Sequence, residues 1–168
     1  MKWIAISGSW QKINRKVEED VRQEVKEILN RGDGIVSGGA LNVDYLATDE
    51  ALEYDPSGSR VKVFIPAILT VYAAHYRQRA EEGIITKQQA EDLIAQLENL
   101  RELKAAPLVE NPTNKVVDRK AYFERNSAVI KAADELVAFH VNSSEGVINT
   151  IEKAKRKGIP IKIFTYTI

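Results

Sequence analysis

The stretch 34–52 constrains the fold more than any other part of the sequence. The apolar run 35–37 predicts a short buried strand, and the spacing of apolar residues after Gly39 predicts a helix to about Glu53. Gly38 and Gly39 fall at the junction, where glycine permits unusual backbone conformations and a close approach of a ligand. Because the helix would direct its free N–H groups and positive dipole end into this turn, the stretch predicts an anion site, most often for phosphate.

The same alternation of strand and helix continues along the chain. Apolar, β-branched runs predict four further strands at 3–7, 60–65, 135–141 and 160–166. Helical spacing predicts further helices at about 14–31, 69–82, 86–106, 121–133 and 147–157. This alternation predicts an α/β fold, a Rossmann-like, doubly wound, mainly parallel five-stranded sheet with helices on both faces.

The order of the five strands decides where a ligand can bind. Right-handed crossovers make the order 3-2-1-4-5 the simplest arrangement, with the topological switch between the first and fourth strands. Ligands of such sheets bind outside the carboxyl ends of the strands at the switch. We therefore expect three loops to converge there, at 8–10, 38–42 and 140–146.

The segment of about 67–118 is longer than a crossover between two strands requires. Its second helix should begin at Thr86, because Thr86 and Gln89 fit a capping box in which each side chain binds the other residue's backbone N–H. We interpret the chain as one domain, 1–168, with 67–118 as a helical insertion that covers a face or edge of the sheet or makes a dimer contact.

Composition narrows the classes of function. Lys plus Arg and Asp plus Glu both number 24, so the net charge is zero, which argues against a strongly basic nucleic-acid binder. The chain has no cysteine, which excludes disulfides and thiol catalysis, and its two histidines show no metal-ligand spacing. No apolar run approaches the length of a membrane span or a signal peptide. We expect a cytoplasmic protein without a metal, a cofactor or a membrane partner.

Ten residues are candidates for ligand binding. Arg125 can hold two phosphate oxygens, although a surface ion pair is the alternative. Asp44 can form a hydrogen bond to a ribose or to the loop, or merely complement its helix dipole. Asn126 more plausibly braces the loops, and Glu145 is the one acid of its loop, a candidate displaced general acid or base. The candidates are Gly8, Ser9, Gly38, Gly39, Asp44, Arg125, Asn126, Ser144, Glu145 and Gly146. Trp10 can stack on a base or pack against the first helix.

In these motifs the chain resembles the SMF/DprA–LOG (SLOG) superfamily of Rossmann-like nucleotide-binding proteins. The matching parts are Ile4-Ala-Ile-Ser-Gly8, Ser37-Gly-Gly-Ala-Leu-Asn-Val-Asp44 with Ala47 and Ala51, Arg125-Asn126, and the run from Asp134 to Phe139 followed by Gly146, Thr150, Ala154 and Gly158-Ile-Pro-Ile. The resemblance implies a nucleotide or nucleotide-derived phosphorylated ligand at the carboxyl edge of the sheet, and it makes a homodimer plausible.

Two branches of the superfamily imply two alternatives. LOG-type phosphoribohydrolases cleave nucleoside monophosphates and carry Pro-Gly-Gly-x-Gly-Thr-x-x-Glu, which maps onto 142–150. Here Asn142-Ser-Ser replaces Pro-Gly-Gly, and Asn149 or Thr150 stands near the expected Glu. The expected catalytic Glu is therefore not in place, which argues against an N-glycosidic hydrolase. The DprA branch binds single-stranded DNA. The neutral charge and the 7% aromatic content argue against that alternative here.

Overall fold

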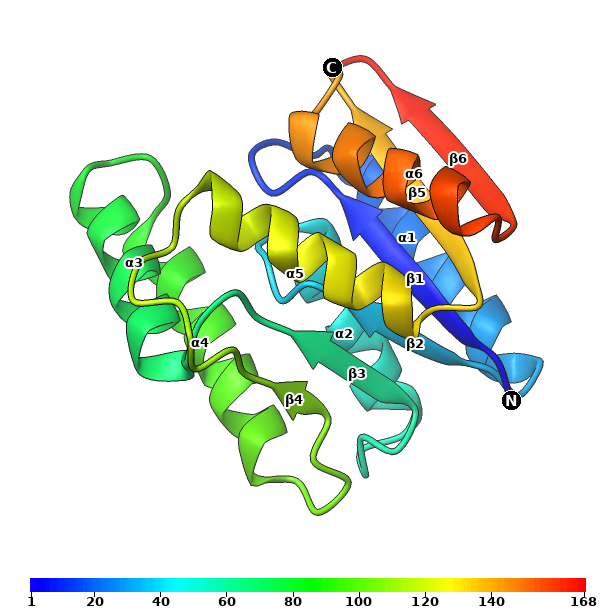
Figure 1. The fold of residues 1–168 in the computed structure, drawn as a ribbon, viewed down its shortest axis with the longest axis horizontal. Coiled ribbons are helices and arrows are strands. Elements are labelled where there is room, and N and C mark those ends of the chain that lie inside the picture. Colours follow the sequence, from blue (N-terminus) through cyan, green and yellow to red (C-terminus); the bar gives the residue numbers. More distant parts are fainter.

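In the computed structural model, which describes residues 1–168, a single parallel sheet forms the centre of the fold (Figure 1). Its strands lie in the order β4-β3-β2-β1-β5-β6. They are β1 (Trp3–Gly8), β2 (Gly34–Ser37), β3 (Val61–Phe64), β4 (Leu108–Val109), β5 (Glu135–Val141) and β6 (Ile161–Tyr166). The fold class and the relative order of the five expected strands are confirmed.

The expected number of strands was wrong, because the sheet has six rather than five. The additional strand, β4, pairs in parallel with β3 at the sheet edge, with Leu108 opposite Val63. Two residues are too few to show an alternating pattern, so no sequence periodicity predicts this strand.

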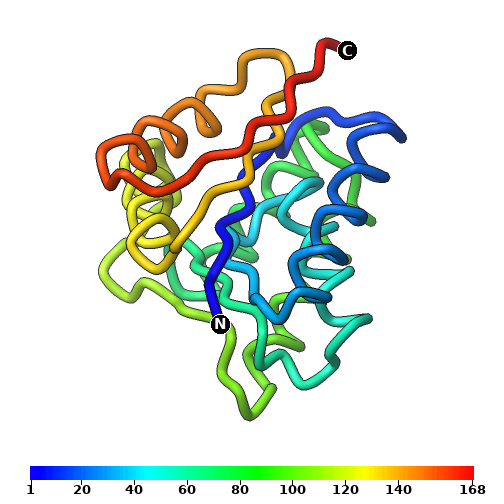
Figure 2. Tube along the Cα trace, turned by 90° about the vertical axis from the view of Figure 1, so that its right-hand side faces the viewer, coloured from blue at the N-terminus to red at the C-terminus, as the bar shows by residue number.

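Helices cover both faces of the sheet. Figure 2 shows α1 (Arg15–Asn30) and α2 (Val43–Tyr54) on one side of the strands, and α5 (Arg119–Ala132) and α6 (Glu145–Lys157) on the other. Successive side chains of β1 point to opposite faces of the sheet, so they pack alternately in the two helical layers. Ile4 and Ile6 belong to a core of 27 buried residues with α1 and α2, and Ala5 belongs to a core of 10 with α5 and α6. Strand β1 is therefore buried between the two helical layers.

The segment 67–118 contains two helices and the edge strand. Helices α3 (Leu69–Glu81) and α4 (Lys87–Glu102) pack against each other, and α4 also contacts α2. The predicted capping box is present, since Thr86 Oγ1 accepts from Gln89 N at 3.0 Å and Gln89 Oε1 accepts from Thr86 N at 2.9 Å. No helix of the fold is both long and apolar enough to cross a membrane.

Helix α6 starts earlier than expected. It begins at Glu145, with Ser144 as its N-cap residue, rather than at Val147. Asn142 and Ser143 have φ angles of 49° and 58°, and this tight left-handed turn brings the chain from β5 directly into the helix. Glu145 and Gly146 are therefore the first two helical residues and do not belong to a loop.

Candidate functional site

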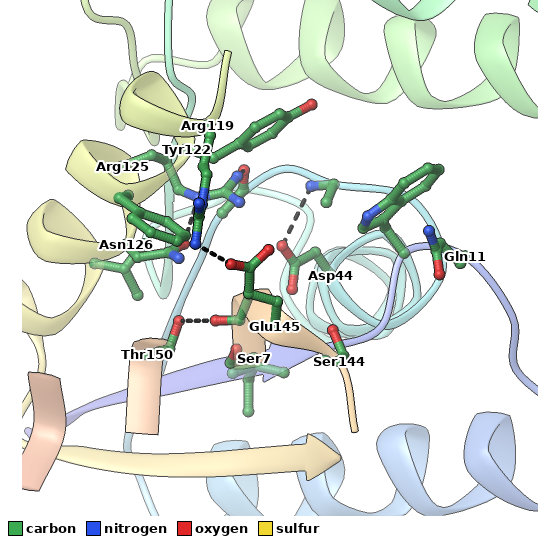
Figure 3. A pocket seen from close by; sticks show the side chains of 18 of the residues that line it. Ser7, Gln11, Asp44, Arg119, Tyr122, Arg125, Asn126, Ser144, Glu145 and Thr150 are labelled. Carbon is green, nitrogen blue, oxygen red and sulfur yellow. Dashed lines mark hydrogen bonds and ion pairs between the residues drawn. The ribbon is translucent and has the colours of Figure 1, made fainter. Parts of the chain in front are cut away.

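A cavity of about 580 Å³ lies at the carboxyl ends of the central strands (Figure 3). Its lining comes from the segments that follow β1, β2 and β5, together with α5, which confirms that the three predicted loops converge. Eight of the ten candidate residues line it: Gly8, Gly38, Asp44, Arg125, Asn126, Ser144, Glu145 and Gly146. Ser9 and Gly39 do not. The volume is typical of small-molecule sites.

The side chain of Arg125 packs directly against the backbone at Gly38. A Cβ atom at Gly38 would lie 2.6 Å from Arg125 Cζ, so only glycine leaves room for the guanidinium group. Arg125 Nη1 donates a hydrogen bond to the carbonyl oxygen of Gly38. Gly38, the first glycine of the turn, therefore makes room for the side chain of Arg125 and not for a ligand.

The guanidinium group of Arg125 retains unused hydrogen-bond donors. Its Nε donates to Asn126 Oδ1 at 3.0 Å, and the guanidinium carbon lies 5.3 Å from the centroid of the Tyr122 ring. Its Nη2 makes no hydrogen bond within the protein, and the group forms no ion pair. Burial opposes its charge, but the neighbouring Tyr72 and Asp44 outweigh this effect, so the pKa of Arg125 is raised. The result is a permanent cation in the cavity wall with free donors for an anion.

Asn126 connects Arg125 to the opposite helix. Its Oδ1 accepts from Arg125 Nε, and its Nδ2 donates to Asn149 Oδ1 of α6 at 3.1 Å. The buried amide therefore holds the guanidinium group in place and ties α5 to α6. This is a bracing arrangement, although Asn126 also lines the cavity.

Asp44 is a buried carboxylate in the first turn of α2. The residue is 5% exposed, and its Oδ2 accepts from Ala40 N at 3.2 Å. Its Oδ1 has no hydrogen-bond partner. Burial raises the pKa of Asp44, and the nearby Arg125 and the backbone N–H groups of Ala40 and Gly38 only partly counter this. The Gly38 N–H is close enough to act on the charge, but it makes no hydrogen bond to Oδ1. The cavity thus combines a cation with an incompletely satisfied acid.

The amino end of α6 forms the other side of the cavity. The hydroxyl group of Ser144 makes no capping bond, and the first N–H groups of a helix have no partner within it. Glu145 is exposed and forms an ion pair with Arg119 of α5 across the mouth (Figure 3). These free N–H groups, Ser144 and Gly146 provide donors opposite Arg125.

Three predicted residues serve the framework. A Cβ at Gly39, where φ is 64°, would lie 2.7 Å from Ile65 Cγ2, and the Gly39 carbonyl accepts from the Tyr72 hydroxyl at 2.9 Å. Ser9 Oγ accepts from Gln11 N at 3.3 Å. Gly8 lines the cavity but also touches the first residue of α2. The structure assigns these residues to turns and packing.

The sequence analysis missed lining residues on α5, mainly Arg119, Tyr122 and Phe123. Arg119, Tyr122 and Asn126 are spaced three and four residues apart, which places them on one helix face. Because Asn126 was already a candidate, the residues four and seven positions before it, Tyr122 and Arg119, could have been predicted to share its helix face. Further missed lining residues are Gln11, Tyr76 and Thr150. Trp10 both lines the cavity and packs against the larger core.

After Glu145, no residue of α6 contributes a carboxylate to the cavity. Thr150 donates its hydroxyl to the Gly146 carbonyl at 3.0 Å, and Asn149 is paired with Asn126. The acids that line the cavity are Asp44 and Glu145. No group of three or more His, Asp or Glu side chains is arranged to hold a metal ion.

Gly146 offers a test that separates stability from binding. No atom lies within 4 Å of a Cβ built there. We expect Gly146→Ala to raise the free energy of unfolding by about 0.5–1 kcal/mol, because alanine favours the helix. The new methyl group should at the same time weaken binding of an anion at the start of α6. Urea unfolding and calorimetric titration measure the two effects, and unchanged affinity would remove Gly146 from the binding site.

Comparison with known proteins gives similarity at the level of the fold. No protein-family model matches the sequence, and no curated protein sequence is significantly similar to it. Among solved structures, DNA processing protein A from Helicobacter pylori, described for its single-stranded DNA binding mode, is 16% identical with a TM-score of 0.69. The match covers 96% of this chain and 64% of that protein.

Two further structures share the fold. DNA processing protein A (DprA) from Streptococcus pneumoniae is 15% identical with a TM-score of 0.66, over 96% of this chain and 50% of that one. The molybdenum cofactor carrier protein from Chlamydomonas reinhardtii is 13% identical with a TM-score of 0.59, over 99% and 79%. The chain thus spans about half to two thirds of the two DNA-processing proteins, and it shares a Rossmann-like α/β fold with all three structures.

Proposed function

We propose that the chain binds a nucleotide or a nucleotide-derived phosphorylated ligand in this cavity. The observation that carries the proposal is the state of Arg125, a cation that forms no ion pair and whose Nη2 group makes no hydrogen bond within the protein. A partly enclosed cation is costly unless an anion accompanies it. A phosphate group meets that need and accepts the free donors in a bidentate arrangement.

The opposite wall favours the same ligand. The N–H groups at the start of α6 and the free hydroxyl of Ser144 add donors for phosphate oxygens. Trp10 and Tyr122 provide aromatic surface in the same cavity for a base. Together these groups match the charged and the apolar parts of a nucleotide.

Single-stranded DNA is the second candidate ligand, favoured by the fold that the chain shares with the two DNA-processing proteins. Its phosphates would use the same Arg125. The neutral net charge argues against it, because DNA binding relies on many phosphate contacts by Lys and Arg. Phosphoribohydrolase activity is the third candidate, and it is disfavoured because Asn149 and Thr150 stand where the catalytic carboxylate is expected.

A thermal-shift screen tests the proposal. The ligands are nucleoside mono-, di- and triphosphates, cyclic dinucleotides, ADP-ribose and a short single-stranded DNA, each compared with the matching unphosphorylated nucleoside where one exists. At a hundredfold excess over Kd, a ligand adds about 2.7 kcal/mol, or about 5–10 °C for a domain of this size. We expect this shift with a phosphorylated nucleotide and none with the nucleoside.

The other outcomes discriminate between the candidates. A shift with DNA alone, reduced at higher salt, would support the DNA-binding alternative. Release of free base from a bound monophosphate would support the hydrolase alternative. Equal shifts with nucleotide and nucleoside would contradict a role of phosphate, and no shift with any compound would contradict the proposal.

A further inference from the structure

The buried carboxylate of Asp44 is the group that phosphate binding leaves unexplained. Asp44 lines the cavity, yet its Oδ1 has no hydrogen-bond partner within the protein. A buried acceptor without a donor is rare and costs free energy. Asp44 forms no ion pair. Arg125 is near enough to lower the pKa of Asp44, but the hydrogen bonds of Arg125 go to Gly38 and Asn126.

The chemistry of a carboxylate limits what can fill this place. A phosphate group would be repelled, so the phosphate must lie toward Arg125 and α6. The ligand must present a neutral donor to Asp44, such as a hydroxyl group. The Cβ–Cγ torsion of aspartate is soft, so a small rotation can turn Oδ1 toward the cavity.

We propose that Asp44 binds the ribose hydroxyl groups of the ligand and thereby selects ribonucleotides over 2′-deoxyribonucleotides. The inference rests on the proposed function, because it assumes that the phosphate lies at Arg125. An acidic side chain that binds the 2′-hydroxyl is a recurrent device where nucleotides meet the edge of a parallel sheet. The 2′-hydroxyl group is also what distinguishes RNA from DNA components.

The selection follows from the unpaired oxygen. A ribose hydroxyl supplies the donor that Oδ1 lacks, whereas a deoxyribose leaves the buried oxygen unpaired. Sites built to hydrogen-bond a ligand hydroxyl discriminate strongly against analogues without it. We expect ribonucleotides to bind at least about tenfold more tightly than their deoxy counterparts.

Calorimetric titration of the full chain tests the inference. The probes are AMP, GMP, CMP and UMP with their 2′-deoxy counterparts, and ribose 5-phosphate with 2-deoxyribose 5-phosphate as a pair without a base. Wild-type protein should prefer the ribose form in each pair that binds. Asp44→Asn should remove this preference, so that the ribose and deoxyribose forms of each pair bind with nearly equal affinity.

Asp49→Asn is the matched control, because Asp49 lies on the same helix, pairs with Arg22 and does not line this cavity. Its preference for ribose should equal that of the wild type. Since burial raises the pKa of Asp44, its ionised form opposes folding at neutral pH, and the melting temperature of ligand-free Asp44→Asn should not fall. A fall in melting temperature would indicate a structural role and count against the inference.

The failures of the two proposals are distinguishable. Equal binding of ribose and deoxyribose forms to the wild type would overturn the role of Asp44 while nucleotide binding stood. A preference that persists in Asp44→Asn would also overturn it. If none of these probes bound, the inference would be wrong, whereas the proposed function would still be decided by the thermal-shift screen with di- and triphosphates, cyclic dinucleotides and ADP-ribose.

Discussion

Replacing Gly8 by alanine is expected to lower the free energy of unfolding by about 3 kcal/mol. A Cβ atom at Gly8 would lie 2.5 Å from Val43 Cβ, which is far inside van der Waals contact. Val43 is fully buried and is the first residue of α2, so it cannot move away without displacing that helix. For a domain of this size, the melting temperature should fall by about 6–12 °C.

Gly146→Ala provides the control for this prediction, because the same substitution there meets open space. Urea unfolding of both variants separates the effect of the contact from the general effect of exchanging glycine for alanine. A loss below about 1 kcal/mol for Gly8→Ala would mean that the end of β1 and the start of α2 can separate at little cost, contrary to the packing described here.

Replacing Arg125 by glutamine is expected to weaken binding of the phosphorylated ligand by about tenfold to a hundredfold. The charged hydrogen bonds of a guanidinium group to a phosphate contribute about 1.5–3 kcal/mol. The ligand-free variant should lose about 1–2 kcal/mol of stability, because Gly38 O and Asn126 Oδ1 lose their donor. Titration at 20 °C, where both proteins are folded, measures the affinity.

Arg156→Gln is the matched control, since Arg156 is exposed in the last turn of α6 and does not line the cavity. It removes the same charge from the chain, so it reports any general electrostatic effect. Comparable affinity losses in both variants would exclude a specific contact at Arg125. The phosphate would then have to be held by α6 alone.

The sequence predicted the framework well where a pattern extends over enough residues. The continuous apolar runs of β1 and β5 marked buried parallel strands, and Gly158 marked the end of α6. Prediction was wrong where the structure depends on few residues. The two-residue strand β4 carries no period, and the positive φ angles of Asn142 and Ser143, neither a glycine, started α6 earlier than expected.

For the candidate site, too, the sequence predicted some features and not others. Its position was predicted from strand order, since the loops at a topological switch must converge. The detailed roles of Gly38 and Gly39 were not predicted. Gly38 makes room for Arg125, and Gly39 adopts a positive φ above Ile65, although the sequence gives no means of telling two adjacent glycines apart.

The sequence by itself determined the parallel α/β fold, the order of its five longer strands and the edge at which a ligand can bind, because periodicity and chain connectivity are local properties. Only the tertiary structure decided which groups remain free at that edge. Arg125 and Gly38 are 87 positions apart, and their contact leaves the Nη2 donors unused. Asp44 likewise keeps an unpaired oxygen because of what surrounds it. These unpaired donors and acceptors result from packing between segments that are distant in the sequence, so no local sequence pattern predicts them.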